Sequence, residues 1–393
     1  MVGKLNIAII GCGPGGLAAA LFLNRQGHAI TIFDQFSEPL PVGSGLLIQP
    51  SGQLVLEQLG LLDRIRALAS PVQQLHGISV EKNRRALDMQ YAYSSDARPA
   101  LGIHRASLFS VLLNEVKEAA IPVVANSKLT GMDETQVSIA PVFEGGLVQA
   151  TFDCLIDASG ARSPVAGGQV KRLDYGAFWA TVDVPEKYEI LPAALDQRYF
   201  RASQMAGIMP IGLNPATGNP GAALFWSEKP ENADELIASG IDAFRQNYCD
   251  LWPAAEPFVS QLQSIEELNL AVYHHRTGLP SSSNRLFYIG DSWHCTSPQL
   301  GQGANMALID AAALAKALEQ SSSLSIARKK YRKARMRHIK LYQVLSIIFT
   351  PLYQSDSRIK PWIRDMVIHN FARWPIIRNF IAKTVSGRLF LSP

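Results

Sequence analysis

The apolar positions of the chain fall into alternating patterns that predict strands and helices. Unbroken apolar runs stand at residues 7–10, 154–156 and 286–289, as expected for strands buried on both faces. The first and last runs lead through small residues into apolar, alanine-rich helices, over residues 17–23 and from Ala304. Strands that alternate with helices in this way predict a parallel sheet covered by helices, which is an α/β fold.

A different pattern occupies the middle of the chain. Between residues 171 and 273, short apolar segments alternate with turn signals such as NPATGNPG at residues 214–221, and aromatic residues are frequent. Residues 74–92 predict two more strands, joined by a polar turn at 82–85. We therefore expect an inserted antiparallel sheet that covers a ligand, with most of its aromatic side chains in its core. The candidates for a substrate pocket are Tyr199, Met209, Trp226 and, from a later loop, Pro298.

Smaller elements complete the prediction. Apolar residues at helical spacing predict one helix over residues 51–65. Another helix is expected to open at Ile103-His104-Arg105, with Ser107 as its candidate cap. Short strands are expected at residues 122–125 and 137–143, and from residue 326 a basic helix is followed by further helices.

Composition narrows the class of protein. The chain has 393 residues, of which 47% are hydrophobic and 18% charged, enough for two or three domains around a large core. Its four cysteines are scattered without a C-x-x-C pair, which argues against a zinc site or a disulfide framework and favours the cytoplasm. No apolar run reaches the roughly 18–20 residues that span a bilayer. The glycines inside the apolar N-terminal stretch favour a strand over a signal peptide.

Charge is distributed unevenly. The net charge is +4, yet from Ser323 onward 15 Lys and Arg stand against 2 Asp and Glu, so this part carries +13 and the rest −9. Such an asymmetry predicts an interacting basic end. The basic helices either pack on the body or touch an anionic membrane surface as a peripheral contact; no nucleic-acid partner is expected.

The first candidate for chemistry is the glycine-rich turn after the first strand. Gly11, Gly13 and Gly16 form G-x-G-x-x-G between a strand and a helix, with Pro14 and Gly15 inside it. The glycines permit a tight turn and close approach to a pyrophosphate, which the helix N-terminus attracts. Asp34 follows Gly16 by 18 residues, where a carboxylate binds the ribose of NAD or of the adenosine half of FAD. The fingerprint predicts a bound dinucleotide and leaves the choice between NAD and FAD open.

Three further features carry candidate chemistry. Residues 284–320 form a strand that ends in Gly290-Asp291, a loop at 298–303 and a long helix, whose dipole suits a reduced flavin; a structural βα crossover explains them equally. Gly43 and Gly45 flank Ser44 in a second glycine loop, which is either a surface for a flat ring or an ordinary loop. Arg105 is either a pyrophosphate partner or a surface cation.

Three segments resemble, in order, those of class A flavoprotein monooxygenases, the FAD-dependent aromatic hydroxylases similar to para-hydroxybenzoate hydroxylase. GCGPGG with Asp34 resembles their FAD fingerprint. IHRASLFSVL resembles the segment whose arginine, here Arg105, lies by the FAD pyrophosphate. GDSWHCTSPQLGQGANMALIDA resembles their second FAD motif, G-D followed by P and G-x-G-x-N. The resemblance covers most of residues 5–318.

The resemblance implies a set of cofactor contacts. Asp291 binds the ribityl or pyrophosphate region, Leu129 contacts adenine through its backbone, and GSGLLIQP is similar to a loop near the flavin. The implied FAD-binding residues are Gly11, Gly13, Pro14, Gly15, Gly16, Asp34, Gly45, Leu46, Leu47, Arg105, Leu129, Asp291, Pro298, Gly301, Gly303, Ala304 and Asn305. The implied domains are an FAD-binding Rossmann-like domain (1–73, 101–170 and 278–325), a substrate-binding β-sheet domain (74–100 and 171–277) and a basic helical region (326–393).

The chain departs from the family at one motif. Where relatives carry A-D-G, this chain has Ala158-Ser159-Gly160, and Pro164 follows where many relatives have an arginine. No arginine lies between Arg25 and Arg64, where some members place one. These departures concern the contact with NAD(P)H more than the binding of FAD.

The resemblance implies an FAD-dependent monooxygenase. NAD(P)H reduces the flavin, O2 adds to give a C4a-hydroperoxide, and one oxygen atom passes to an aromatic or a polyketide- or quinone-like lipophilic substrate. The alternatives are a dehydrogenase or reductase on the same fold and a flavin-binding protein without NAD(P)H turnover. No metal is expected and no catalytic residue is assigned; His274, His275 and Tyr199 are candidates to deprotonate a phenol.

Overall fold

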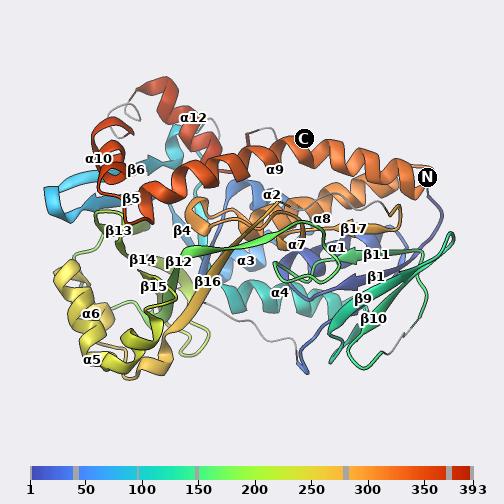
Figure 1. Cartoon of the computed structure of the whole chain (residues 1–393), viewed down its shortest axis with the longest axis horizontal. Coiled ribbons are helices and arrows are strands. Elements are labelled where there is room, and N and C mark those ends of the chain that lie inside the picture. The colour runs from blue at the N-terminus through green and yellow to red at the C-terminus, as the bar shows by residue number, and fades with distance from the viewer. Residues whose placement is uncertain are drawn as a thin grey trace.

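The computed structural model describes residues 2–38, 44–94, 97–146, 150–277, 283–368 and 374–389. Figure 1 shows an elongated molecule with a parallel sheet at one end, a larger sheet towards the other, and the long helix α9 (Leu324–Tyr353) running along both. Gly43 of the second glycine loop lies outside the described residues.

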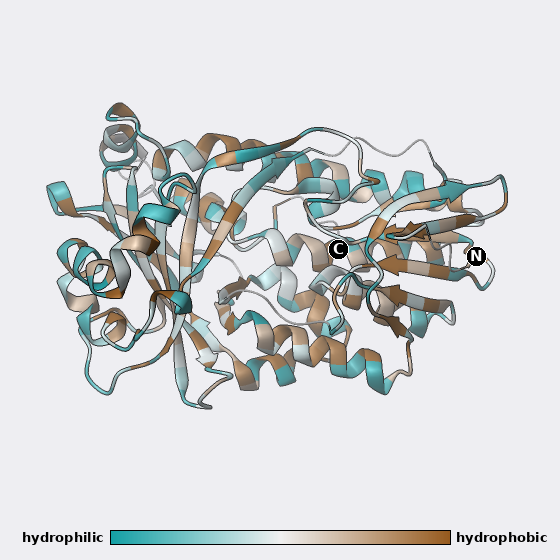
Figure 2. Cartoon of the chain, turned by 60° about the horizontal axis from the view of Figure 1, so that its bottom comes forward, coloured by the Kyte–Doolittle hydropathy of each residue, from teal (hydrophilic) through white to brown (hydrophobic). Residues whose placement is uncertain are grey.

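The parallel sheet is built from the apolar runs of the sequence. Its strand order is β17-β11-β1-β2-β8, and all neighbouring strands are parallel. Ile7, Ile9 and Ile156 are fully buried, and Figure 2 shows these strands in hydrophobic brown along much of their length. The strand predicted at 154–156 does pair with the first strand, with Ile9 opposite Ile156. The strands are β1 (Asn6–Ile10), β2 (Ala29–Phe33), β8 (Val123–Val124), β11 (Cys154–Asp157) and β17 (Leu286–Tyr288).

Three helices pack together beside this sheet. Helix α1 (Pro14–Arg25) lies against both α4 (Arg105–Glu118) and α8 (Gly303–Glu319). The start of α4 agrees with the prediction, but its cap does not: the His104 side chain, not Ser107, accepts the hydrogen bond from the Ala106 N–H. The strand predicted at 137–143 is β10 (Ile139–Phe143), which pairs with β9 (Leu129–Glu134), a strand too polar to be recognised in the sequence.

The larger sheet has seven strands in the order β16-β12-β15-β14-β13-β5-β6. It is antiparallel except at one pair, because the hairpin β5–β6 comes from an earlier segment of the chain and joins β13 in parallel. One face, the outer face, is covered by α5 (Ala233–Leu251) and α6 (Glu256–Val259). The strands are β5 (Gln74–Ser79), β6 (Arg84–Gln90), β12 (Val170–Asp183), β13 (Ala194–Phe200), β14 (Gln204–Leu213), β15 (Pro220–Glu228) and β16 (Asn269–Arg276).

A small three-stranded sheet joins the two large ones. It consists of β3 (Gly45–Ile48), β7 (Ala100–His104) and β4 (Ser70–Val72), and β3 and β7 pack on β14 of the larger sheet. The single helix predicted over 51–65 is instead two helices, α2 (Pro50–Gln58) and α3 (Leu62–Leu68). Gly60, in the left-handed region at φ +70°, turns the chain between them.

The C-terminal part is helical, as predicted. After α9 come α10 (Ile359–Ile363), a π-helical turn (Arg364–Ile368) and α12 (Pro375–Val385). In the described part of the chain, no helix combines the length and the apolar character needed to cross a membrane. The domain boundaries given above stay predictions.

Candidate cofactor and substrate site

The first glycine turn is fixed by close backbone packing. Gly11 adopts φ +104°, and a Cβ there would lie 2.6 Å from the carbonyl oxygen of Ala158, the residue after β11. A Cβ on Gly16 would fall far inside van der Waals contact of the Gly11 carbonyl oxygen. Only glycine fits these two positions, so the turn holds α1 directly against β1.

The N-terminus of α1 is open. Gly13 is the N-cap residue and provides no side-chain cap, and the first turn contains no acidic residue. A Cβ on Gly13 would meet no atom within 4 Å, so space lies beside it. Pro14, at the first helical position, lacks an N–H, but the following N–H groups have no capping side chain. This end of the helix therefore suits an anion such as a pyrophosphate.

Asp34 follows β2 beside this turn. Its Oδ2 accepts a hydrogen bond from the Cys12 N–H at 2.7 Å, and its Oδ1 accepts one from the Phe36 N–H at 3.1 Å. The two bonds orient the carboxylate, and each oxygen keeps a lone pair for a ligand hydroxyl. The neighbouring segment is tied to it, since the Ser127 N–H donates to the Asp34 carbonyl just before β9 opens at Leu129. The structure thus brings Leu129 towards Asp34.

The second motif is locked to the first. Gly290 adopts φ +63°, and a Cβ on either Gly15 or Gly290 would lie 3.0 Å from the Ala307 Cβ on α8. Ala307 therefore packs against both motifs. The Gly290 N–H also donates to Asp310 Oδ2 at 2.8 Å, which anchors the end of β17 to the same helix.

Asp291 follows β17 beside the second motif. Its side chain is exposed to solvent, yet the protein around it raises the pKa of its carboxyl, a burial effect that His294 and Arg105 oppose. Arg105 is the first residue of α4 and directly follows β7. Asp34 and Asp291 follow the carboxyl ends of β2 and β17, so these two predicted groups belong to the same edge of the parallel sheet.

The loop before α8 is held by side chains from distant parts of the sequence. Asn305 is fully buried; its Oδ1 accepts from the Gln49 N–H, and its Nδ2 donates to the carbonyls of Leu47 and Gly301. Gly301 adopts φ +59° after the short helix Pro298–Leu300. Helix α8 then begins at Gly303 without a side-chain cap, and a Cβ on Gly303 would again meet open space. Pro298 and Ala304 stand at the accessible side of this loop.

Strand β3 faces the inner face of the seven-stranded sheet, the face opposite α5. A Cβ on Gly45 would lie 2.5 Å from Ile211 Cγ2 and 2.7 Å from the Ala223 Cβ, and Met209 is in the same place. Leu46 and Leu47 continue β3 towards the α8 loop. The structure therefore brings the predicted residues Gly45 to Leu47 and Met209 together.

An aromatic group continues this inner face. The rings of Trp179 and Phe225 lie 5.0 Å apart, and the Trp179 Nε1–H donates to Tyr273 Oη at 3.2 Å. Tyr273 is partly accessible, yet enclosure raises the pKa of its hydroxyl to about 12, although the Trp179 hydrogen bond opposes the shift. Sequence reasoning did not single out Phe225 or Tyr273, because alternation alone cannot tell which face of a sheet meets the site.

Two predicted pocket residues lie elsewhere. Trp226 alternates to the outer face, where its ring packs 6.0 Å from Phe244 and 5.6 Å from Tyr248 of α5. Tyr199 is buried under the C-terminal helices, 5.4 Å from Tyr353, and its hydroxyl donates to Gln197 Oε1. The structure does not bring either residue to the glycine loops.

Gln49 is a buried polar residue that the sequence did not reveal. The Tyr91 hydroxyl donates to Gln49 Oε1 at 2.6 Å, which fixes the amide, while Gln49 Nε2 is buried and has no hydrogen-bond partner among the described residues. This nitrogen lies 3.3 Å from the place of a Cβ on Gly301. A buried donor without a partner, beside the α8 loop, is consistent with a ligand there.

A buried ionic network links α8 to its neighbours α7 (Asp291–His294) and α9. Asp310 accepts from His294 Nε2 and from Arg335 Nε, both at 2.6 Å, and Arg335 also donates to His338 Nδ1 at 3.0 Å. Burial alone would raise the pKa of Asp310, but His294 and Arg335 hold it at about 2. Burial and the neighbouring Arg335 lower the pKa of His338 to about 3. His338 Nε2 donates to the Gly387 carbonyl, so the network joins α8 to the end of α12.

The motif Ala158-Ser159-Gly160, at which the chain differs from the A-D-G of its relatives, forms a compact turn. Ser159 donates through its hydroxyl to Asp157 Oδ1 at 2.6 Å, and Ser163 donates to Asp157 Oδ2 at 2.5 Å. Burial raises the pKa of Asp157, opposed by these hydrogen bonds. Ser159 is thus engaged inside the turn.

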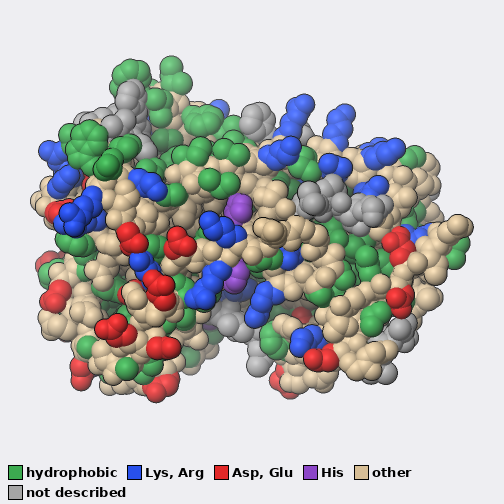
Figure 3. Space-filling model, in the orientation of Figure 1, with side chains coloured by type: hydrophobic (Ala, Val, Ile, Leu, Met, Phe, Trp, Pro, Cys, Tyr) green, Lys and Arg blue, Asp and Glu red, His purple; other side chains and the backbone are tan. Residues whose placement is uncertain are grey.

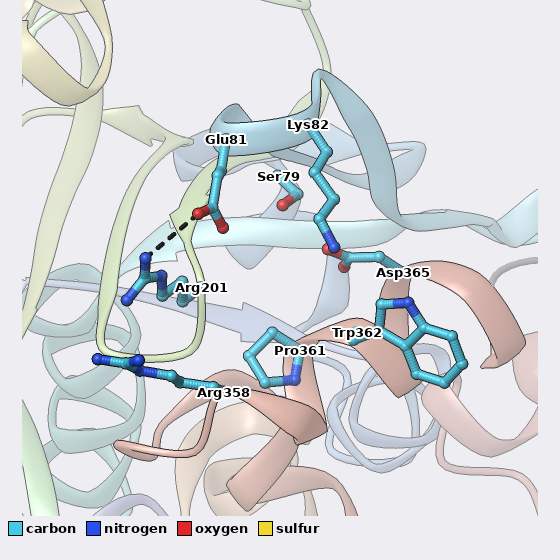
Figure 4. A pocket seen from close by; sticks show the side chains of 8 residues that line it. All are labelled: Ser79, Glu81, Lys82, Arg201, Arg358, Pro361, Trp362 and Asp365. Atoms are coloured by element: carbon cyan, nitrogen blue, oxygen red, sulfur yellow. Dashed lines mark hydrogen bonds and ion pairs between the residues drawn. The ribbon is translucent and has the colours of Figure 1, made fainter.

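A separate polar cavity lies at the far end of the larger sheet. It has a volume of about 220 Å³ and lies between the turn after β5 and helix α10 (Figure 4). Lys82, Arg201 and Arg358 line it together with Trp362, and Arg201 pairs with Glu81. None of its lining residues belongs to the glycine loops. In the described ranges, no group of three His, Cys, Asp or Glu side chains could hold a metal ion.

Comparison with known proteins places this site in a family. Residues 4–323 match the family model of the FAD binding domain. The chain is 26% identical over 346 residues to the FAD-dependent monooxygenase notI of Aspergillus sp. (strain MF297-2), covering 82% of this chain and 77% of that protein. It is 24% identical over 331 residues to 6-hydroxynicotinate 3-monooxygenase of Bordetella bronchiseptica, covering 82% and 84%. The crystal structure of Klebsiella pneumoniae HpxO with FAD and uric acid matches with a TM-score of 0.78 at 19% identity, over 98% of each chain.

The chain therefore belongs to the FAD binding domain family and is a class A flavoprotein monooxygenase. The resemblance drawn from the three motifs is confirmed, and FAD is its cofactor.

Proposed function

We propose that this enzyme transfers one oxygen atom of O2 to an aromatic or a quinone- or polyketide-like lipophilic substrate, with NAD(P)H as reductant. The observation that carries the proposal is that the site has two unlike parts. Two uncapped helix N-termini with Asp34 and Asp291 make one part suited to a dinucleotide. The inner face of the seven-stranded sheet makes the other part, which is apolar and aromatic.

In this proposal the dinucleotide part holds FAD, which supplies electron transfer from the nicotinamide and the activation of O2. The N–H groups at the start of α1, next to Gly13, bind the pyrophosphate, and the Arg105 guanidinium adds a positive charge. Asp34 accepts the adenosine ribose hydroxyls, with the backbone at Leu129 flanking the adenine. Asp291 accepts hydroxyls of the ribityl chain. The open space at Gly13, the oriented Asp34 carboxylate and the exposed Asp291 fit these roles.

The flavin ring is proposed to lie between β3 and the loop before α8. Gly45, Leu46 and Leu47 flank one side of it, and Pro298 with the segment from Gly301 to Asn305 flanks the other. The α8 N-terminus favours negative charge on the ring, because its dipole is positive at that end. The Gln49 amide, held by Tyr91, offers its unpartnered N–H group to this place.

A flat aromatic substrate fits the second part. Trp179, which is partly accessible and packs on the buried Phe225, offers a ring face, and Met209 and Ala223 keep water away. Because Trp179 donates to Tyr273 Oη, the hydroxyl hydrogen of Tyr273 is free to donate to a substrate oxygen. The pKa of about 12 keeps that hydrogen in place at neutral pH.

A candidate proton acceptor, His275, lies on the same strand as Tyr273, two residues further along. Burial and the neighbouring Lys171 lower the pKa of His275 below its usual value, so its imidazole is neutral at pH 7. We propose His275 on β16 as the candidate base for a phenolic substrate. The matching test is His275→Gln, which is expected to lower kcat with phenolic substrates and to leave FAD binding unchanged.

The decisive test uses the purified enzyme with FAD. Anaerobic mixing with NADH or NADPH is expected to bleach the flavin absorbance. Turnover in ¹⁸O2 with phenols, hydroxypyridines or quinolones is expected to place one ¹⁸O atom in the product. A product that is reduced or desaturated without ¹⁸O would show a reductase or dehydrogenase instead.

One observation favours a second candidate, a flavin-binding protein without NAD(P)H turnover. Ser159 replaces the aspartate of the family motif, and its hydroxyl donates a hydrogen bond to Asp157. If the flavin stays oxidised with either nicotinamide in the presence of substrates, this candidate gains. In that case Ser159→Asp is the variant expected to restore reduction, and Ser159→Ala is its matched control.

A further inference from the structure

One side of α9 changes character along its length. A set of exposed positions on α9 recurs every three or four residues, which places them on one stripe of the helix. In the first part of the stripe these residues are basic: Lys330, Lys333, Arg337 and Lys340. In the last part they are apolar: Val344 is 52% exposed, Ile347 58% and Ile348 56%. The opposite side of α9 is buried against the body, so this stripe is left to solvent.

The helices that follow extend the apolar part. On α10, on α12 and at Trp374 just before α12, bulky apolar side chains are exposed to an unusual degree: Ile359 70%, Trp362 49%, Trp374 61%, Ile376 85% and Phe380 50%. Figure 3 shows hydrophobic side chains gathered over the end of the molecule where α10 and α12 lie, while Lys and Arg side chains line the rest of α9. We call the exposed stripe of α9 and these five residues the docking face. A clustered apolar surface next to a basic one indicates an interaction site.

The positive charge of the docking face is not balanced by acidic neighbours on the same helices. Between Ser323 and the C-terminus, the chain has only Asp356 and Asp365. Asp356 is engaged by Lys229 at 2.8 Å and by the Tyr175 hydroxyl at 2.7 Å. Asp365 is buried and paired with Arg364. The face therefore offers net positive charge.

We propose that the docking face binds the surface of an anionic lipid bilayer. Ile347, Ile376 and Phe380 enter the boundary of the acyl chains, the two tryptophans lie at headgroup level, and Lys333, Arg337 and Lys340 meet lipid phosphates. A second copy of the chain is a poorer occupant, because the basic stripes of two copies would repel each other. The proposal concerns a surface outside the proposed cofactor site, and its test requires no turnover.

The location of the face is suited to a lipophilic substrate. The end of α12 is tied to the site: Gln302 Nε2 donates to the Val385 carbonyl, and the Ser51 N–H donates to the Ser386 carbonyl. Ser51 and Gln302 neighbour Gln49 and Gly303, so the segment next to the docking face reaches the loop before α8. Membrane binding would bring this loop close to the lipid phase.

The experiment is co-sedimentation of the FAD-loaded protein with vesicles. The protein is expected to pellet with phosphatidylglycerol-containing vesicles and to stay in solution with pure phosphatidylcholine. Raising salt from about 0.1 M to about 1 M shortens the Debye length from about 10 Å to about 3 Å and should weaken binding sharply. Failure to bind the anionic vesicles at low salt overturns the proposal.

Matched charge variants locate the contact. K333E/R337E/K340E is expected to lose at least about 100-fold in affinity, since each basic residue near the surface contributes about fivefold and each new carboxylate adds repulsion. K4E/K117E/K187E changes the net charge equally at exposed positions away from the face and should bind nearly as the parent does. Equal losses in both variants would mean that only the total charge matters, and would overturn the assignment to this face.

Apolar variants and solution mass complete the test. I347S/I348S/I376S/F380S should lose the binding that persists at high salt, whereas V137S/I237S, with exposed apolar residues elsewhere, should keep it. Unchanged flavin content and circular dichroism in each variant exclude misfolding. A dimer in sedimentation velocity that the quadruple variant splits, without vesicle binding by the parent, would assign the face to a second copy and overturn the proposal.

Discussion

The two helices that begin at the proposed cofactor site, α1 and α8, look alike at their starts but are supported differently. Both follow a glycine-containing loop after a strand of the same sheet, and neither has a side-chain cap or an acidic first turn. The start of α1 is fixed by backbone contact, with Gly16 packed on the Gly11 carbonyl. The start of α8 is fixed by side chains, chiefly Asn305 and Gln302. A short-range motif therefore positions one helix, and long-range hydrogen bonds position the other.

The sharpest test of this contrast is a pair of variants in the first loop. In Gly16→Ala the new Cβ would overlap the Gly11 carbonyl, so α1 must move off β1, and we expect a loss of at least about 3 kcal/mol with no FAD retained. In Gly13→Ala the Cβ enters open space, so the stability of the apoprotein should change by less than about 1 kcal/mol. Urea unfolding of the apoproteins measures both. If the two variants unfold at the same urea concentration, backbone contact does not fix this loop.

The second loop should respond to the loss of one side chain. Asn305→Ala leaves the Gln49 N–H and the carbonyls of Leu47 and Gly301 without their partner, and we expect a loss of about 2–3 kcal/mol and weaker FAD binding. Asn379→Ala removes one half-buried hydrogen bond to the Tyr93 carbonyl and is the matched control, with about 1 kcal/mol expected. Urea unfolding and flavin titration give the two readouts. Equal effects would mean that Asn305 has no special place in the loop.

This contrast also explains what the sequence predicts and what it leaves hidden. The first loop, Asp34 and the α8 start were visible because their residue types and spacing are local. Gln49, Tyr91 and Asp310 were not, because each acts through a partner that is distant in sequence. Trp226 and Phe225 are adjacent, and the pattern could not tell which of them faces the site. The prediction of a single helix over 51–65 was wrong, because Gly60 turns the chain although apolar residues continue at helical spacing on both sides of it.

The buried network behind α8 predicts a dependence of stability on pH. His338 has a pKa of about 3 in the folded protein, below the unfolded value of about 6.5. Its contribution is complete above pH 6.5 and is lost as pH falls from there towards 3, so about 2 kcal/mol should be lost between pH 7 and pH 5. His338→Gln keeps a donor and an acceptor but does not titrate, and should flatten this part of the profile.

Urea unfolding at a series of pH values separates His338 from its neighbour. Asp310, with a folded pKa of about 2, contributes above its unfolded value near 3.8 and loses that contribution only below it. A loss of stability between pH 7 and pH 5 that persists in His338→Gln would therefore have another origin. The reference is Lys117→Gln, a substitution at an exposed position outside the network. Its stability profile should match that of the parent protein.

The smallest expected change in stability distinguishes open space from packing at the start of α8. Gly303 is exposed, and a Cβ there would meet no atom within 4 Å, as at Gly13. Because alanine favours a helix over glycine, Gly303→Ala should leave the apoprotein unchanged or stabilise it by less than about 1 kcal/mol. The same Cβ would project towards the proposed place of the flavin ring, so FAD affinity should fall by about tenfold, equivalent to about 1.4 kcal/mol. Tighter FAD binding by this variant would show that the ring lies elsewhere, whereas weaker binding with intact stability would show that both helix starts face the same cofactor.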